Sequence, residues 1–130
     1  MGDLTGKTIG ILGLTFKPST DDMRDASSLV ILPELVKSGA KIKAFDPQGE
    51  RESRWRLKAI ESSIEYCEDE YTAVEDCDAC VILTEWNQFR SLNLKKIKEL
   101  MHADYFFDFR NIYERKLVEG LGFVYDCVGR

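Results

Sequence analysis

The sequence has little of what marks a nucleic-acid-binding or membrane protein. Its 18 lysine and arginine residues are outnumbered by 23 acidic residues, which gives a formal net charge of -5 and leaves no basic stripe. A phosphate backbone would therefore be repelled by this chain. No apolar run approaches the ~20 residues that cross a bilayer, and no signal pattern opens the sequence. We expect a cytoplasmic protein that binds neither nucleic acid nor a membrane.

Cysteine and histidine are also scarce. Four irregularly spaced cysteines are too few for a secreted disulfide framework, and the single histidine, His102, leaves no ligand cluster for zinc or another metal. Cys77 and Cys80 have the spacing of a redox pair, but they enter an apolar strand and do not open a helix, where the dipole would lower a thiol pKa. We expect both to be buried and reduced, and a freestanding nucleotide-binding or redox-sensing module is the alternative.

No linker, repeat or low-complexity tract divides the chain, so residues 1–130 are expected to form one domain. Apolar strand-like segments alternate with segments of helical periodicity, which predicts an α/β fold: a three-layer, Rossmann-like, mostly parallel sheet with helices on both faces. The expected strands are 7–14, 41–46, 64–67, 79–84, 105–109 and 123–127. The first expected helix starts at a cap, Asp25 or Ser27, is kinked at Pro33 and ends at Gly39. Further helices are expected at 50–62, 69–76, 93–101 and 111–119, and Asn111 is expected to cap the last of them. Residues 50–62 could instead be a partly mobile excursion.

The first expected strand contains Gly10-Ile11-Leu12-Gly13, at the place where a dinucleotide-binding fold has its glycine loop. The spacing is GxxG and not GxGxxG, and Asp46 follows Gly13 by more than 30 residues, whereas a ribose-binding acid is expected after about 20. We therefore favour a structural role over NAD binding by this loop. Gly10 and Gly13 would permit a tight strand exit and a close helix contact.

The loop after this strand places charged groups at the carboxyl end of a buried strand, where open α/β sheets bind their ligands. Lys17 could neutralise a phosphate. Arg24 could donate to phosphate or ribose oxygens, or it could be held by Asp21 and Asp22. The residues alone leave these alternatives for Arg24 open.

Four segments carry a family resemblance: GKTIGILGLTFKPSTDDMRDASS, KIKAFDP, VILTEWNQF and FFDFRNIY. Their order and spacing resemble the UDP-glucose/GDP-mannose dehydrogenase family over nearly the whole chain. In that family two Rossmann-like domains flank a long helix, and the N-terminal domain holds NAD while the C-terminal domain holds the UDP part of the substrate. This chain resembles only the second domain. The resemblance is strongest to members that oxidise UDP-glucose, and members acting on GDP-mannose or UDP-N-acetylmannosamine are the alternative.

The resemblance implies site residues and partners. Phe16 and Lys17 would contact the UDP-sugar, Arg110 would hold substrate, and Arg24 would reach toward NAD. The partners would be the N-terminal NAD-binding and central helical parts of the same enzyme, which would be a homo-oligomer. The family's nucleophile motif, GGxCxxKD, is missing from this sequence, so the chain is expected to be inactive alone. Trp86 and Phe89 could stack on a base, but aromatic residues after a buried strand are more often core.

Overall fold

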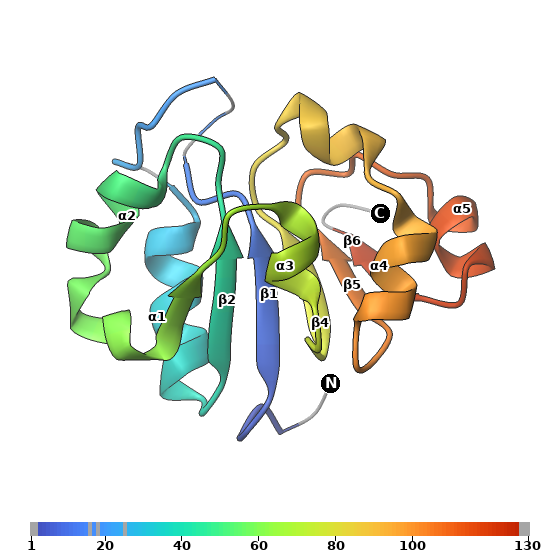
Figure 1. Ribbon diagram of the computed structural model, residues 1–130, viewed down its shortest axis with the longest axis horizontal. Helices are drawn as coiled ribbons and strands as arrows, with labels where there is room; N and C mark the ends of the chain where they lie inside the picture. Colours follow the sequence, from blue (N-terminus) through green and yellow to red (C-terminus); the bar gives the residue numbers. More distant parts are fainter. Residues whose placement is uncertain (1–2, 16, 18, 25, 128–130) are drawn as a thin grey trace.

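The computed structural model describes residues 3–15, 17, 19–24 and 26–127. Within these residues, six parallel strands form one open sheet in the order β3-β2-β1-β4-β5-β6 (Figure 1). The strands are β1 (Thr8–Leu12), β2 (Lys41–Phe45), β3 (Ile64–Tyr66), β4 (Ala79–Ile82), β5 (Tyr105–Asp108) and β6 (Val124–Cys127). The predicted Rossmann-like fold class is confirmed.

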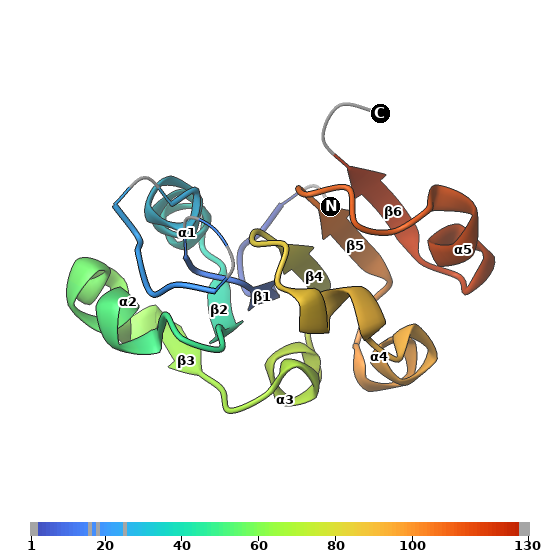
Figure 2. The same ribbon diagram turned by 90° about the horizontal axis from the view of Figure 1, so that it is seen from above.

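Helices cover both faces of the sheet, as Figure 2 shows from above. One face carries α1 (Ser28–Lys37), α2 (Glu50–Arg56) and the 3-10 helix η1 (Lys58–Ser63). The other carries α3 (Glu70–Val74), the 3-10 helix η2 (Asn87–Ser91), α4 (Leu94–Leu100) and α5 (Arg115–Gly120). The chain changes faces after β3, so the strand order reverses between β1 and β4. No helix in the described ranges is long and apolar enough to cross a membrane.

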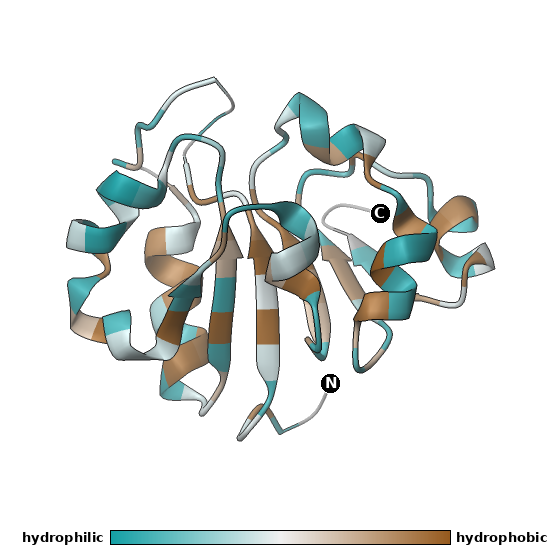
Figure 3. Cartoon of the chain, viewed as in Figure 1, coloured by the Kyte–Doolittle hydropathy of each residue, from teal (hydrophilic) through white to brown (hydrophobic). Residues whose placement is uncertain are grey.

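Each face of the sheet has its own hydrophobic core, because successive strand residues point to opposite faces. In β1, Ile9 and Ile11 pack beneath α1, whereas Leu12 faces α3 and α4. Figure 3 shows this as hydrophobic bands on the central strands and hydrophilic outer turns on the helices. A Cβ on Gly10 would lie 2.7 Å from the Ala73 carbonyl oxygen of α3. The predicted close helix contact at Gly10 is confirmed.

Several helix ends differ from the sequence predictions. The segment 50–62 is helical, but it divides into α2 and η1 at Leu57. The first helix begins after Ser27, whose side chain makes no capping hydrogen bond, and it continues through Pro33 to Lys37. Asp25, the alternative cap, lies outside the described residues.

Asp69 caps α3, since its carboxylate accepts a hydrogen bond from the Thr72 backbone N–H at 2.7 Å.

The prediction that Asn111 caps the last helix is wrong. Asn111 has a φ of 56°, and α5 begins four residues later at Arg115, with Glu114 at the cap position. Asparagine tolerates this left-handed backbone better than most residues. Asn111 therefore belongs to the turn that leaves β5, and this turn is part of the candidate site.

Candidate functional site

The carboxyl ends of β1, β4 and β5 are adjacent, and the loops that leave them are joined by hydrogen bonds. Thr84, which follows β4, donates its hydroxyl to the Thr15 carbonyl oxygen at 2.8 Å. Arg110, which follows β5, donates from Nε to the Leu83 carbonyl oxygen at 2.8 Å. This edge includes the point between β1 and β4 where the strand order reverses, which is the usual ligand position in open α/β sheets. We define these loops as the carboxyl-edge site.

Asp46, at the end of β2, organises this site. Its Oδ2 accepts from the backbone N–H groups of Leu14 (2.7 Å) and Thr15 (3.2 Å), and the Thr15 hydroxyl lies 3.2 Å from the same oxygen. Its Oδ1 accepts from the backbone N–H groups of Gln48 (2.9 Å) and Gly49 (2.7 Å). The residue is only 6% exposed. Both carboxylate oxygens therefore accept hydrogen bonds from the chain itself, and Asp46 does not act as a ribose-binding acid.

Trp86 and Phe89 are core residues. The Trp86 indole donates from Nε1 to Asp46 Oδ2 at 3.2 Å, and the residue is 7% exposed. Phe89 is fully buried and meets Phe45 edge-to-face, with 6.2 Å between the ring centroids. The interpretation of these aromatic residues as packing groups is confirmed. Trp86 also ties the loop after β4 to the loop after β2.

A second buried carboxylate, Asp108 at the end of β5, fixes the turn that carries Arg110. Its oxygens accept from the backbone N–H groups of Arg110 (3.1 Å), Ile112 (2.9 Å) and Tyr113 (3.0 Å), and from the Tyr125 hydroxyl (2.9 Å). Asp108 is fully buried. Sequence analysis missed this role. The available signal was an aspartate that ends an apolar strand, the same signal as at Asp46.

Lys17 lies in the loop after β1 and is exposed. The Thr15 hydroxyl donates to the Lys17 carbonyl oxygen at 3.1 Å, so the backbone here is attached to the Asp46 network. None of the ion pairs between described residues includes Lys17. Phe16, the other residue expected to contact the UDP-sugar in this loop, lies outside the described residues.

Arg110 is half-buried beside the carboxyl end of β4. Its Nε lies 3.4 Å from the Glu85 carboxylate as well as 2.8 Å from the Leu83 carbonyl oxygen. These contacts hold the guanidinium against the loop after β4, and the side chain is 31% exposed. The structure therefore places Lys17 and Arg110 on the same edge of the sheet, on either side of the loop after β4.

Arg24 is held by Asp22. The guanidinium donates from Nε and from one terminal nitrogen to the two Asp22 oxygens at 3.2 Å and 3.0 Å. Hydrogen bonds from Arg24 lower the pKa of Asp22 to about 2. The pair lines a hollow of about 280 Å³ together with Glu52 and Arg56 near α2. Of the alternatives for Arg24, the structure shows the intrachain pair with Asp22.

The glycine segment of β1 offers no cradle for a dinucleotide. Gly13 has a φ of 98°, and a Cβ built there would lie 2.6 Å from the Cβ of Thr84. The corresponding space at Gly10 is filled by α3. Close approach of a pyrophosphate requires this space to be open. The residues of this loop therefore do not fit NAD.

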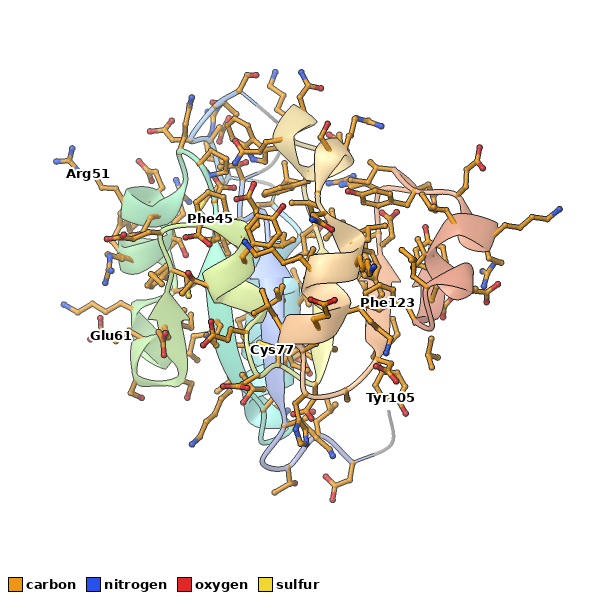
Figure 4. All side chains as sticks on the ribbon, turned by 45° about the vertical axis from the view of Figure 1, so that its right-hand side comes forward. Phe45, Arg51, Glu61, Cys77, Tyr105 and Phe123 are labelled. Carbon is orange, nitrogen blue, oxygen red and sulfur yellow. The ribbon has the colours of Figure 1, made fainter. Side chains whose placement is uncertain are left out.

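The cysteine pair is buried. Cys77 and Cys80 are fully buried, and both are free thiols, as is Cys67. Figure 4 shows Cys77 inside the molecule, in contrast to Arg51 and Glu61, which point outward from α2 and η1. Burial raises the pKa of Cys77 to about 12 and also raises the pKa of Cys80. The expected burial is confirmed, and these protonated thiols are poor nucleophiles near neutral pH.

Comparisons with known proteins agree with this arrangement. Residues 10–115 match the model of the UDP binding domain of the UDP-glucose/GDP-mannose dehydrogenase family. The chain is 42% identical to UDP-glucose 6-dehydrogenase of Rhizobium meliloti and 39% identical to UDP-glucose 6-dehydrogenase TuaD of Bacillus subtilis. These matches cover 99% and 100% of this chain, but only 29% and 28% of the two relatives.

A solved structure of a nucleotide-sugar dehydrogenase also matches nearly the whole of this chain. UDP-D-ManNAc dehydrogenase of Pyrococcus horikoshii superposes with a TM-score of 0.75 at 26% identity, over 98% of this chain and 27% of that protein. The family model, the sequence relatives and the solved structure therefore agree over the same segment. The chain belongs to the UDP-glucose/GDP-mannose dehydrogenase family, and it matches the family's UDP-binding domain.

Proposed function

We propose that the 130 residues form one domain whose carboxyl-edge site binds the UDP part of a nucleotide sugar. One observation carries this proposal: Lys17 is an exposed cation without an ion-pair partner among the described residues, on a loop anchored at the strand-order reversal. The position of Lys17 suits a ligand that brings its own negative charge, and a pyrophosphate is such a ligand.

The chemistry proposed for the site is recognition. The Lys17 ammonium would neutralise a phosphate as a point charge, and Arg110 would contribute a second cation from the opposite side of the loop after β4. Phe16 would contact the same UDP-sugar. The surrounding chain has a net charge of -5, so these local cations would be needed to offset repulsion of the anionic ligand.

The whole enzyme is proposed to be an NAD-dependent UDP-glucose 6-dehydrogenase. It would convert UDP-glucose, two NAD and water to UDP-glucuronate and two NADH in the cytoplasm, for polysaccharide biosynthesis, as a homo-oligomer. The support is that relatives 36–42% identical to this chain carry that name. The N-terminal part would hold NAD and the nucleophile, and Arg24 would reach toward NAD only if its pair with Asp22 opens. The domain would bind substrate without turning it over.

A second candidate is the same role in an enzyme for another nucleotide sugar. The observation that favours it is the superposition on the Pyrococcus horikoshii protein, which is named as a dehydrogenase of UDP-D-ManNAc. Both candidates share the UDP group. The two are therefore separated by the sugar that the intact enzyme oxidises.

Isothermal titration calorimetry tests the proposal. UDP should bind the chain, and GDP should bind more weakly. Lys17→Ala should cost about 1.5 to 3 kcal/mol of binding free energy, because a hydrogen bond to a charged group is lost. That cost corresponds to about 10- to 150-fold in affinity. The control is Lys41→Ala, since Lys41 is also exposed but starts β2 at the opposite edge of the sheet. Equal UDP affinity in the two folded variants would show that Lys17 is only a surface charge.

A further inference from the structure

Arg110 uses one edge of its guanidinium for contacts within the protein and leaves the other edge available. Its Nε donates to the Leu83 carbonyl oxygen at 2.8 Å and lies 3.4 Å from a Glu85 carboxylate oxygen. Neither terminal nitrogen donates a hydrogen bond to any of the described residues. A guanidinium with both terminal nitrogens available can hold two oxygens of one phosphate at the same time. The direction in which Arg110 points therefore determines whether it can bind a phosphate in this way.

Glu85 stands between two residues whose side chains are fixed. Thr84 is fully buried and donates its hydroxyl to the Thr15 carbonyl oxygen at 2.8 Å. Trp86 is buried, and its indole Nε1 donates to Asp46 Oδ2 at 3.2 Å. These two contacts hold the chain on both sides of Glu85. The backbone from which the Glu85 carboxylate extends is therefore held independently of its ion-pair partner.

The arginine is the more adjustable member of the pair. Asp108 accepts from the Arg110 backbone N–H at 3.1 Å, which fixes only the place where the side chain begins. Several rotatable bonds separate that backbone from the guanidinium, so an arginine without contacts would populate many rotamers. The side chains of Arg110 and Glu85 are each 31% exposed, so water only partly reaches the pair. The guanidinium therefore depends on Leu83 and Glu85 for its direction.

The Arg110–Glu85 pair differs from most ion pairs among the described residues in what it connects. It joins the loop after β5 to the loop after β4, and both loops belong to the carboxyl-edge site. The pair of Arg24 and Asp22 lies within one loop, and three other pairs join positions four apart on one helix. A pair along one helix adds little beyond local helix stability. A contact between two loops instead fixes the arrangement of the groups that they carry.

We infer that Glu85 is a positioning residue for Arg110, which turns the guanidinium so that both terminal nitrogens face a phosphate of the ligand. The inference rests on the proposed function, because it takes the carboxyl-edge site as the place where UDP binds. Its physical basis is preorganisation, since a side chain that is already held in its binding direction loses less rotamer freedom when the ligand arrives. The Glu85 charge would also repel a pyrophosphate, but water and salt screen the repulsion between partly exposed groups. Preorganisation should therefore outweigh repulsion.

Isothermal titration calorimetry of the 130-residue chain with UDP tests this role. Glu85→Ala should weaken UDP binding about two- to tenfold, the range for ordering one long side chain. Glu85→Gln should restore at least the affinity of the unsubstituted chain, because its amide oxygen can still accept from Arg110 Nε and the repelling charge is gone. The control is Glu61→Ala, which removes an exposed carboxylate from η1 and should leave UDP affinity unchanged.

A double-substitution cycle shows whether the effect passes through Arg110. In an Arg110→Ala background, Glu85→Ala should no longer weaken UDP binding, because no guanidinium is left to direct. A loss of the same size in both backgrounds would overturn the inference, since Glu85 would then act on the ligand or on the fold. Unchanged or tighter UDP binding by Glu85→Ala in the otherwise unsubstituted chain would also overturn it.

A measurement without nucleotide separates this inference from the proposed function. The ¹⁵N relaxation of arginine Nε–H groups reports how well each guanidinium is ordered. Arg110 should be ordered in the unsubstituted chain and in Glu85→Gln, and in Glu85→Ala its order should fall toward that of the exposed Arg51. Unchanged order of Arg110 in Glu85→Ala would contradict the positioning role even if UDP binds. If UDP does not bind but Arg110 loses order in Glu85→Ala, the proposed function fails and the control of Arg110 by Glu85 stands.

Discussion

Asp46→Asn tests whether a single carboxylate organises the carboxyl-edge site. The substitution keeps the size of the side chain but replaces one acceptor oxygen with an NH₂ group, which can only donate. In the native structure every neighbour of the carboxylate is a donor: Leu14, Thr15 and Trp86 at Oδ2, and Gln48 and Gly49 at Oδ1. The amide must therefore face donors in either orientation.

The size of the stability loss follows from the more favourable of the two orientations of the asparagine amide. With NH₂ in the Oδ1 position, the asparagine keeps the Oδ2 partners and loses two acceptors, those of the Gln48 and Gly49 backbone N–H groups. A buried donor without a partner costs about 1 to 3 kcal/mol. Because Gln48 is only partly buried, we expect the free energy of unfolding to fall by about 2 to 4 kcal/mol. A domain with the usual 5 to 15 kcal/mol would remain folded.

Urea denaturation followed by tryptophan fluorescence measures this loss. The matched control is Asp69→Asn, an aspartate that caps α3 in an exposed position. Asparagine caps helices about as well as aspartate, so this control should stay within about 0.5 kcal/mol of the unsubstituted chain. If Asp46→Asn changes stability no more than Asp69→Asn does, the carboxylate does not organise the site.

Three further outcomes are expected. Burial raises the pKa of Cys77 from 9.0 and of Tyr113 from 10.0, both to about 12, so the folded state holds these protons more tightly than the unfolded state. Urea midpoints should therefore be unaffected by these groups below pH 9 and fall between pH 9 and 12, and a flat profile there would contradict their burial. Gly10→Ala should cost about 1 to 3 kcal/mol of unfolding free energy by overpacking against α3, whereas Gly120→Ala, with open space around it, should not destabilise, as thermal unfolding of both variants can show. The chain mixed with UDP-glucose and NAD should give no protein-dependent rise in absorbance at 340 nm, and a clear rise would place a nucleophile within these residues.

The alternation of apolar and helical segments was sufficient to predict the strands and the fold class. Segments such as residues 79–84 are apolar on both sides, which indicates a strand covered on both faces, and β4 has this position in the sheet. The GxxG spacing also indicated a structural role for Gly10, and the close contact between Gly10 and α3 confirms this role. These properties depend on residues close together in the sequence or on one repeating pattern.

The site was less predictable because its contacts join distant residues. Asp46 meets Trp86 across 40 positions, and Thr84 meets Thr15 across 69. No local pattern indicates which donors a buried carboxylate will find. The error at Asn111 has a related cause: the residue is a good cap by type, but the backbone N–H groups that follow it are held by Asp108.

UDP is proposed to bind where the loops after β1, β4 and β5 meet. A titration of the ¹⁵N-labelled chain with UDP, followed by amide chemical shifts, tests it most directly. The largest shifts should lie at residues 13–17, 84–86 and 108–113, and the amino ends of the strands, including Lys41 and Ile64, should not respond. Largest shifts at the amino ends of the strands, or no shifts at millimolar UDP, would show that UDP does not bind at the carboxyl-edge site.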